Sequence, residues 1–221
     1  MCGRFAFYSP HEAVQDLFGV TFPAAVEPRY NIAPSQFVVA LRADERALEP
    51  AVLKWGLVPS WAKDPKIGNR MINARAETVH EKPSFRAAFK RRRCVILADG
   101  FYEWRRTGDS KTPYFIAMQD RQPFAMAGLW EQWQGGEGTE LQTCTIITTA
   151  ANEIMKPLHD RMPVILSPDN AHHWCGPDGD ERAAAQGLLA ANANEAMVYW
   201  PVSTVVNNPR NDGPELIGVR V

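Results

Sequence analysis

The spacing of the prolines constrains the fold of this chain more than any other feature. Seventeen prolines divide its 221 residues into many short apolar runs. Proline lacks the backbone N–H and interrupts both helices and central strands. Short apolar runs between such interruptions are typical of β-strands. With 45% hydrophobic residues the chain can still bury a sizeable core, so we expect a β-rich fold with few helices.

The apolar runs predict strands of similar character along the whole chain. The predicted strands lie at 37–42, 51–56, 71–78, 94–98, 101–105, 113–118, 124–133, 141–149, 162–166 and 197–202. The sequence Ser9-Pro10-His11-Glu12 predicts a capping box, with Gly19 ending that helix. Further helices are predicted at 83–90, 152–156, 168–174 and 181–191, and the glycine-rich stretch 135–138 predicts a hairpin loop. We therefore expect one α+β domain over residues 1–221, with a curled, barrel-like antiparallel sheet and a few peripheral helices.

Several classes of protein do not fit the composition. No apolar run approaches 18 residues, and the N-terminus has no apolar leader segment. The four cysteines are far apart and show no CxxC spacing, which argues against a disulfide framework or a zinc site. His172, His173 and Cys175 lie close in sequence but lack a partner cluster at ligand spacing. We expect no metal, no cofactor and no membrane contact, and a reducing cytoplasm as the location.

Charge is distributed unevenly along the chain. Residues 50–111 hold 14 Lys and Arg against six Asp and Glu, while the rest holds 10 against 19, which gives the net charge of −1. A basic segment in an acidic chain is the footprint expected of a polyanion groove. A solvated face beside a basic helix end at 90–93 explains the same numbers equally well.

The N-terminus offers the most distinctive chemistry. If Met1 is removed, Cys2 carries both a thiol and a free α-amine. An α-amine has a pKa of about 8, against roughly 10.4 for lysine, so far more of it is neutral near pH 7. The neutral amine condenses with an aldehyde to an imine, and the adjacent thiol can then close a thiazolidine ring. The alternative is that Cys2 merely follows the start residue, and retention of Met1 would block this reaction.

Polar residues elsewhere could line a site. In a strand over 71–78, Asn73, Arg75 and Glu77 share one face, which suits either a site or a solvent-facing surface. Glu103 lies among aromatic residues, where desolvation would raise its pKa and suit acid/base work, or where it pairs with an arginine. His159 precedes a strand and either projects into a cleft or belongs to a structural network with Asp160 and Arg161.

Two tryptophans, Trp55 and Trp61, lie within the basic segment. Aromatic rings among cations are used by proteins that bind single-stranded nucleic acid. Two buried core tryptophans are the alternative.

Taken in order, these signals resemble the SRAP family (SOS response-associated peptidase). The matching motifs span residues 1 to 163: Met1-Cys2-Gly3-Arg4-Phe5, Arg29-Tyr30-Asn31-Ile32-Ala33-Pro34, Trp55-Gly56-Leu57-Val58-Pro59-Ser60-Trp61, Asn73-Ala74-Arg75-Ala76-Glu77-Thr78, Arg91-Arg92-Arg93-Cys94, Gly100-Phe101-Tyr102-Glu103-Trp104 and His159-Asp160-Arg161-Met162-Pro163.

The resemblance implies a covalent sensor of abasic sites in single-stranded DNA and at single-strand to double-strand junctions. It implies that Cys2 is the nucleophile that forms a thiazolidine cross-link with the lesion, that Asn73 positions Cys2 and the sugar, that Glu103 is the general acid/base, and that His159 assists sugar opening and proton transfer. The residues it implies as DNA contacts are Arg4, Trp55, Trp61, Arg75 and Arg161. It is also consistent with a monomer near the nucleoid.

Two other functions remain open on the sequence. Cys2, Glu103 and His159 could support a cysteine peptidase or N-terminal-nucleophile amidohydrolase, possibly limited to self-processing at Met1. Alternatively, the chain is a non-enzymatic DNA-binding module.

Overall fold

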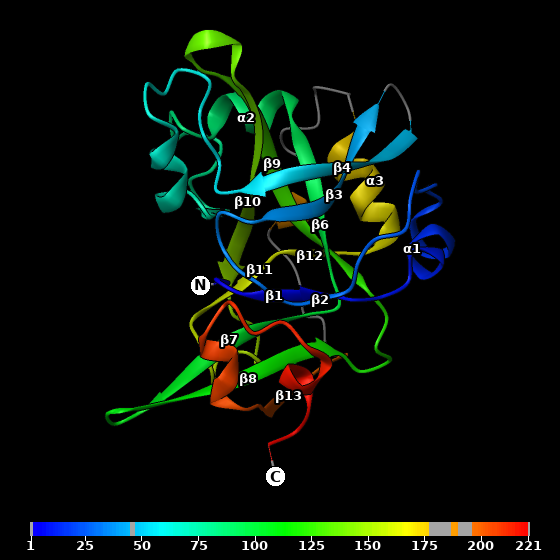
Figure 1. Ribbon diagram of the computed structural model, residues 1–221, viewed down its shortest axis with the longest axis vertical. Helices are drawn as coiled ribbons and strands as arrows, with labels where there is room; N and C mark the ends of the chain where they lie inside the picture. The colour runs from blue at the N-terminus through cyan, green and yellow to red at the C-terminus, as the bar shows by residue number, and fades with distance from the viewer. Residues whose placement is uncertain (1, 45–46, 177–186, 190–195, 221) are drawn as a thin grey trace.

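The computed structural model describes residues 2–44, 47–176, 187–189 and 196–220. Two β-sheets account for most of the fold, with the larger above the smaller in Figure 1. The N-terminus lies between the two sheets, and the C-terminus lies at the far end of the smaller one. The expected α+β class with a barrel-like sheet and few helices is confirmed.

Five strands of the larger sheet form a closed barrel. They are β3 (Phe37–Asp44), β4 (Ala47–Trp55), β6 (Arg93–Ala98), β9 (Phe124–Gln134) and β10 (Glu140–Ala150). The order β10-β4-β3-β6-β9 closes because β9 also pairs with β10, as the hairpin predicted at 135–138 requires. The sheet is not purely antiparallel, since β4 runs parallel to β10 at Lys54 and Trp55. Closure leaves the central barrel strands without a free edge there.

Three short strands extend the barrel sheet. They are β5 (Asn73–Arg75), β11 (Arg161–Pro163) and β12 (Ile165–Leu166). Strand β5 runs parallel to β10, with Arg75 opposite Thr148, and β11 runs antiparallel to β10, with Arg161 opposite Ala150. The strand predicted at 71–78 is thus three residues long, and Glu77 lies in the turn that follows.

The smaller sheet is antiparallel and has the order β13-β8-β7-β1-β2. Its strands are β1 (Phe5–Phe7), β2 (Arg29–Ile32), β7 (Gly100–Thr107), β8 (Ser110–Met118) and β13 (Met197–Pro201). Strand β1 pairs with β2 on one side and with β7 on the other. The first residues of the chain are therefore fixed against a segment that follows about a hundred residues later.

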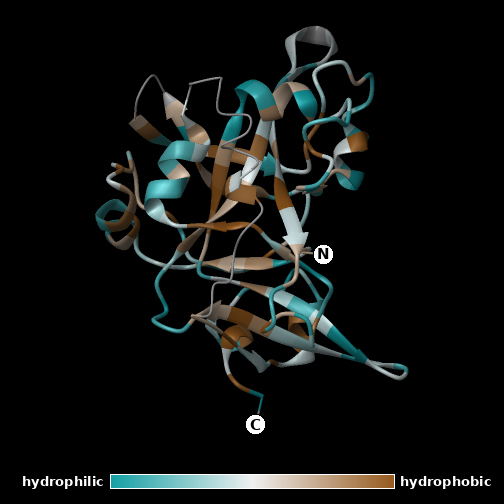
Figure 2. Cartoon of the chain, turned by 180° about the vertical axis from the view of Figure 1, so that it is seen from behind, coloured by the Kyte–Doolittle hydropathy of each residue, from teal (hydrophilic) through white to brown (hydrophobic). Residues whose placement is uncertain are grey.

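The core follows the barrel strands, where Figure 2 shows long brown, hydrophobic stretches, and brown stretches also occur in the smaller sheet. All six residues of β6 are buried, because both faces of that strand are covered. Phe5 of β1 packs edge-on against Trp55 of β4, with ring centroids 5.2 Å apart. This aromatic pair joins the two sheets directly behind the N-terminus.

The α-helices α1 (His11–Phe18), α2 (Arg86–Arg91) and α3 (Pro168–Cys175) lie on the periphery. Gly19 ends α1 in the left-handed conformation, as predicted. The predicted capping box is wrong, because the Ser9 hydroxyl donates to the buried Asp99 carboxylate instead of capping the helix. Residues 152–156 form hydrogen-bonded turns and not the predicted helix. The helix predicted at 181–191 lies largely outside the described residues.

The buried Arg93 side chain bridges the ends of two helices. It donates to the carbonyl oxygens of Phe89 in α2, of Trp174 in α3 and of Gly176 just after α3. The partial negative charge at helix C-termini stabilises a cation at this position. The described residues also include the 3₁₀ turns η1 (Pro65–Arg70), η2 (Gly136–Gly138), η4 (Thr204–Asn207) and η5 (Pro214–Ile217), and residues 187–189 are helical. No described helix is long and apolar enough to cross a membrane.

Candidate functional site

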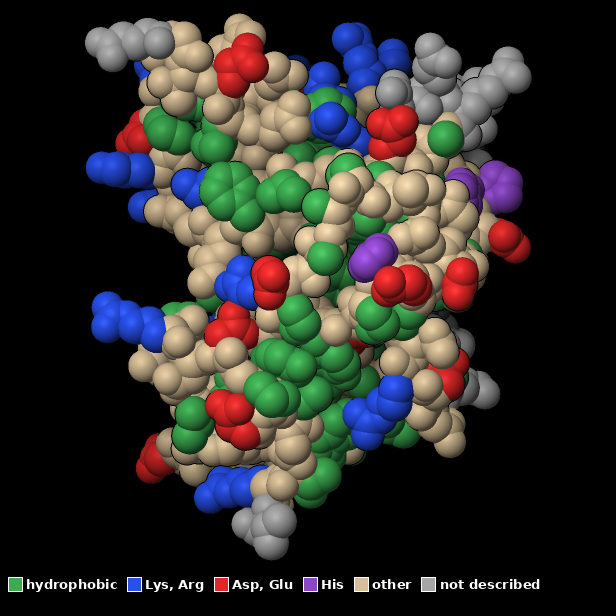
Figure 3. Space-filling model, turned by 45° about the vertical axis from the view of Figure 1, so that its right-hand side comes forward, with side chains coloured by type: hydrophobic (Ala, Val, Ile, Leu, Met, Phe, Trp, Pro, Cys, Tyr) green, Lys and Arg blue, Asp and Glu red, His purple; other side chains and the backbone are tan. Residues whose placement is uncertain are grey.

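The candidate site lies at the start of β1, where the barrel and the smaller sheet meet (Figure 1). Four segments contribute to it: the residues before β1, strand β5, strand β7 and the turn before β11. In the space-filling view the outline is indented at this level, with Lys and Arg side chains above and below the indentation (Figure 3).

Cys2 lies at the centre of this region. Its carbonyl oxygen accepts a 2.8 Å hydrogen bond from the Asn73 amide nitrogen. Its thiol is fully buried, and burial, followed by the negative charge of Glu103, raises its pKa well above the usual range. The thiol is therefore neutral at pH 7. The Asn73 amide oxygen is buried and has no hydrogen-bond partner among the described residues, which leaves an acceptor available beside Cys2.

Glu103 reaches the site from β7. The backbone N–H of Tyr102 donates to the Arg4 carbonyl oxygen, which fixes Glu103 relative to the residues before β1. Only 4% of Glu103 is exposed, and burial raises its pKa to about 7, although the positive amino terminus of the chain lowers it. Near neutral pH this carboxyl group therefore gives and takes protons with similar ease.

His159 lies in the turn before β11, and burial lowers its pKa. Its Nδ1 accepts a 2.9 Å hydrogen bond from the Arg161 backbone N–H and also lies 2.7 Å from an Asp160 carboxylate oxygen. Because burial lowers its pKa, the ring is mainly neutral at pH 7, where its contact with Asp160 is not an ion pair.

Arg161 is already engaged on both of its terminal nitrogens. It binds Glu77 through two contacts of 2.5 and 2.9 Å, and it donates to the Thr148 carbonyl oxygen at 2.6 Å. The bond to Arg161 is the main reason that the pKa of Glu77 is lowered. Arg75, opposite Thr148 in the sheet, has an exposed side chain. Of these two arginines, Arg75 is the one that presents its charge to solvent.

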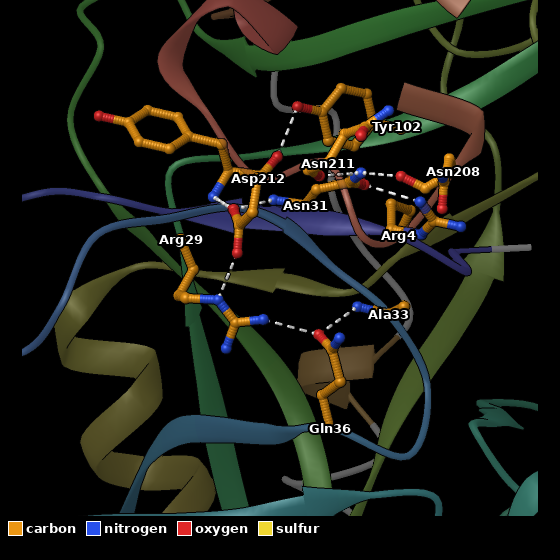
Figure 4. A network of polar contacts seen from close by, with 10 residues as sticks. Arg4, Arg29, Asn31, Ala33, Gln36, Tyr102, Asn208, Asn211 and Asp212 are labelled. Carbon is orange, nitrogen blue, oxygen red and sulfur yellow. Dashed lines mark hydrogen bonds and ion pairs between the residues drawn. The ribbon is translucent and has the colours of Figure 1, made fainter. Parts of the chain in front are cut away.

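Arg4 is held by the C-terminal part of the chain (Figure 4). Its guanidinium donates at 2.7 Å to the Asn31 side-chain oxygen and at 2.8 Å to the Val206 carbonyl oxygen. The fully buried Asn31 uses its amide nitrogen to bind three backbone carbonyl oxygens, those of Val206, Asn208 and Asn211. Asp212 completes the network by accepting from Arg29 and from the backbone of Tyr30 and Asn31.

The two tryptophans of the basic segment are in different environments. Trp55 is 1% exposed, packs on Phe5 and donates to the Ile72 carbonyl oxygen. Its ring belongs to the core and offers no face to DNA, contrary to the expected role as a DNA contact. Trp61 is 59% exposed and free to stack on an aromatic ligand.

A cluster of metal ligands is absent from the described residues. The site brings together a buried cysteine, an amide, a carboxyl group with a raised pKa and an imidazole with a lowered pKa. This set can move protons and orient a carbonyl group.

A comparison with known protein families identifies the family of this chain. The family model described as SOS response associated peptidase (SRAP) matches residues 1–209. The chain belongs to the SRAP family. The resemblance inferred from the sequence motifs is thus confirmed.

Two bacterial relatives match this chain over nearly their whole length, and a longer vertebrate relative matches it over about two thirds of its own length. The abasic site processing protein YoaM of Bacillus subtilis is 47% identical, over 98% of this chain and 97% of that protein. The abasic site processing protein YedK of Escherichia coli is 35% identical, over 98% and 99%. The abasic site processing protein HMCES of Xenopus tropicalis is 38% identical, over 86% of this chain and 65% of that protein.

Solved structures share the fold. A protein from Bacteroides thetaiotaomicron has a TM-score of 0.89 at 26% identity, with all of both chains covered. A phage-related protein from Bordetella bronchiseptica has a TM-score of 0.73 at 31% identity, over 91% of this chain and 94% of the other.

Sequence reasoning gave no role to three residues that organise this SRAP site. Thr148 holds Arg161, Asn31 holds Arg4, and Asp212 anchors the segment that carries Asn31. Asn31 lies within one of the family motifs, but its three carbonyl partners are more than 170 residues away in sequence. No local pattern identifies such partners.

Proposed function

We propose that this protein captures abasic sites in DNA covalently through Cys2, after removal of Met1. The named relatives are abasic site processing proteins, which supports this lesion as the target. The observation that carries the proposal is the joint placement of Cys2, Asn73 and Glu103: the amide of Asn73 binds the Cys2 backbone, and the buried Glu103 carboxyl lies within electrostatic reach of the thiol.

The reaction proceeds in two balanced steps. The neutral α-amine of Cys2 adds to the open-chain aldehyde, and loss of one water gives an imine. The thiol then adds to the imine carbon while its proton passes to the imine nitrogen, which closes the thiazolidine ring. No oxidant, reductant or further leaving group is required, and the adduct has the summed mass of its parts less one water.

Glu103 and Asn73 have separate roles in this scheme. A carboxyl group with a pKa of about 7 can protonate the departing water and afterwards accept the thiol proton. Asn73 holds the Cys2 backbone in place, and its unpartnered amide oxygen is available to the sugar hydroxyls. The neutral His159 accepts or donates a proton during opening of the sugar ring.

The charge states argue against a cysteine peptidase. Such an enzyme attacks as a thiolate, which an adjacent imidazolium stabilises. Here burial raises the pKa of the Cys2 thiol and lowers that of His159, so both groups are neutral at pH 7. An amine that attacks first needs no thiolate. These shifts favour aldehyde capture over peptide hydrolysis.

Exposed groups around the site suit single-stranded DNA and its junctions with duplex. Trp61 offers a ring for base stacking, and Arg75 offers a cation for a phosphate. The guanidinium groups of Arg4 and Arg161 are hydrogen-bonded within the protein. Each must therefore exchange a present partner before it can bind a phosphate. The proposed species is a monomer that uses no cofactor.

Intact mass spectrometry tests the proposal. The protein is incubated with a single-stranded oligonucleotide that carries one abasic site. We expect a chain without Met1 that gains the oligonucleotide mass less one water, and no adduct with Cys2→Ala. Turnover of peptide substrates without a DNA adduct would support the peptidase instead. A complex that does not survive denaturation in either variant would indicate a binding module.

A further inference from the structure

A cavity of about 330 Å³ lies beside Trp61, and its charged lining residues have no role in the site described above. Its lining residues are Trp61, Ala62, Lys63, Asp64, Lys66, Ile67 and Arg70. Lys63, Lys66 and Arg70 are exposed, and none of them makes an ion pair with a described residue. The single carboxylate, Asp64, accepts from the Lys66 backbone N–H at 2.9 Å. Three cations therefore face one cavity whose only anion is already hydrogen-bonded.

The loop that carries these cations is held rigidly on the barrel. The Val58 N–H donates to the Thr143 hydroxyl at 2.9 Å, and the Trp133 indole donates to the Ala62 carbonyl oxygen at 2.7 Å. Gly56 and Gly68 pack backbone to backbone, and a Cβ on Gly56 would lie 2.7 Å from the Gly68 oxygen. Binding of a ligand here therefore costs little conformational entropy in the loop.

The cavity is close to the proposed reaction centre along the chain. Arg70 precedes Asn73 by three residues, so their Cα atoms are at most about 11 Å apart. Within that reach a DNA strand held at Cys2 has flanking phosphates that can enter the cavity. The exposed Trp61 at its rim offers a face for a base.

We infer that Lys63, Lys66 and Arg70 form a binding site for the phosphodiester backbone of the DNA that flanks the lesion. This inference rests on the proposed function and deepens it, because it assigns the flanking strand to one surface. The site is electrostatic, so it contributes affinity irrespective of base sequence. It takes no part in the covalent step.

The test separates affinity from chemistry. Binding of an undamaged single-stranded oligonucleotide is measured at several salt concentrations on a Cys2→Ala background. The triple variant Lys63→Gln, Lys66→Gln, Arg70→Gln is expected to bind roughly tenfold more weakly, and its salt slope is expected to fall by about 2, at about 0.7 per phosphate contact.

A control triple variant has the same residue types and comes from the same basic segment: Lys82→Gln, Arg86→Gln, Lys90→Gln. It loses the same charge from exposed positions in and before α2. We expect its salt slope to remain that of the parent. Equal losses in the two triple variants would overturn the inference, since only general charge would then matter. An unchanged slope in the first triple variant would overturn it as well.

A second measurement keeps failure of the inference distinct from failure of the proposed function. With Cys2 present and saturating abasic oligonucleotide, the first triple variant should form the cross-link at the parent rate. If the parent forms no cross-link, the proposed function fails. If the parent cross-links and the triple variant binds undamaged DNA as the parent does, only the phosphate site fails.

Discussion

The Asn73 side-chain nitrogen donates a 2.8 Å hydrogen bond to the Cys2 carbonyl oxygen, across 71 residues of sequence. This contact links strand β5 of the barrel to the residues that precede β1. It holds the backbone of the proposed nucleophile from a rigid element, as precise chemistry requires.

Replacement of Asn73 by alanine tests that contact. We expect Asn73→Ala to slow cross-linking about tenfold, because loss of one hydrogen bond of about 1 kcal/mol also releases the nucleophile from its orientation. Affinity for undamaged DNA should stay within about twofold of the parent. Rates come from denaturing gels, and affinity from anisotropy. A parallel loss of both would show that Asn73 serves DNA binding and not orientation.

Replacement of Cys2 by serine separates the two chemical steps. Cys2→Ser keeps the α-amine but lacks the thiol, so the imine forms and no thiazolidine follows. We expect an adduct after borohydride reduction and none that survives denaturation without it. Intact mass distinguishes the two. Absence of any trapped species, in a chain shown to lack Met1, would contradict amine-first attack.

Glu103 should impose a pH dependence on the reaction. Burial raises its pKa to about 7, so the wild-type rate should change through an ionisation near that value. In Glu103→Gln we expect a slow rate without this ionisation, and nearly unchanged DNA affinity. A pH–rate profile of both proteins provides the check, and persistence of the same ionisation in the variant would assign it to another group.

The same shift makes a prediction for stability. The pKa of Glu103 is higher in the folded chain than in the unfolded chain, so the buried carboxyl group destabilises the fold only when it is ionised. This destabilisation is absent at a pH below the pKa of the unfolded chain, and it grows as pH rises towards the folded pKa of about 7. Glu103→Gln should therefore be more stable than wild type at pH 8, by on the order of 1 to 3 kcal/mol, with little difference at pH 4. Urea unfolding at the two pH values measures this.

Glu77 should compete with DNA for Arg161. Its carboxylate occupies the guanidinium group in the geometry that a phosphate would use. We expect Glu77→Gln to bind single-stranded DNA several-fold more tightly at low salt, and we expect the gain to vanish in a double variant with Arg161→Gln. Weaker binding by Glu77→Gln alone would instead mean that Glu77 orients Arg161 for the phosphate.

Asn31 should be important for stability. Its side chain makes four hydrogen bonds without any exposure to solvent, and Asn31→Ala leaves three carbonyl oxygens and the Arg4 guanidinium without that partner. We expect a loss of about 2 to 4 kcal/mol in the free energy of unfolding by urea. Asn208→Ala is the control, since its contact is through the backbone carbonyl and should survive.

The sequence alone determined the elements whose signals are local. Gly19 ends α1 because a residue without Cβ adopts the left-handed conformation easily, and Gly138 takes the same conformation in the β9–β10 connection. Alternating or continuous apolar runs located most of the strands, because the residues that bury a strand face lie close together in the sequence. The ordered motifs likewise indicated the family.

The tertiary structure decided what depends on distant partners. Ser9 does not cap α1, because its hydroxyl donates to the distant Asp99 carboxylate. Trp55 is a core residue, because its ring packs on Phe5 and its indole N–H donates to the Ile72 carbonyl oxygen. The raised pKa of Glu103 follows from its burial between elements that the chain brings together only on folding. Closure of the barrel also needs the pairings of β6 with β9 and of β4 with β10, and a pairing between strands so far apart in the chain leaves no local trace in the sequence.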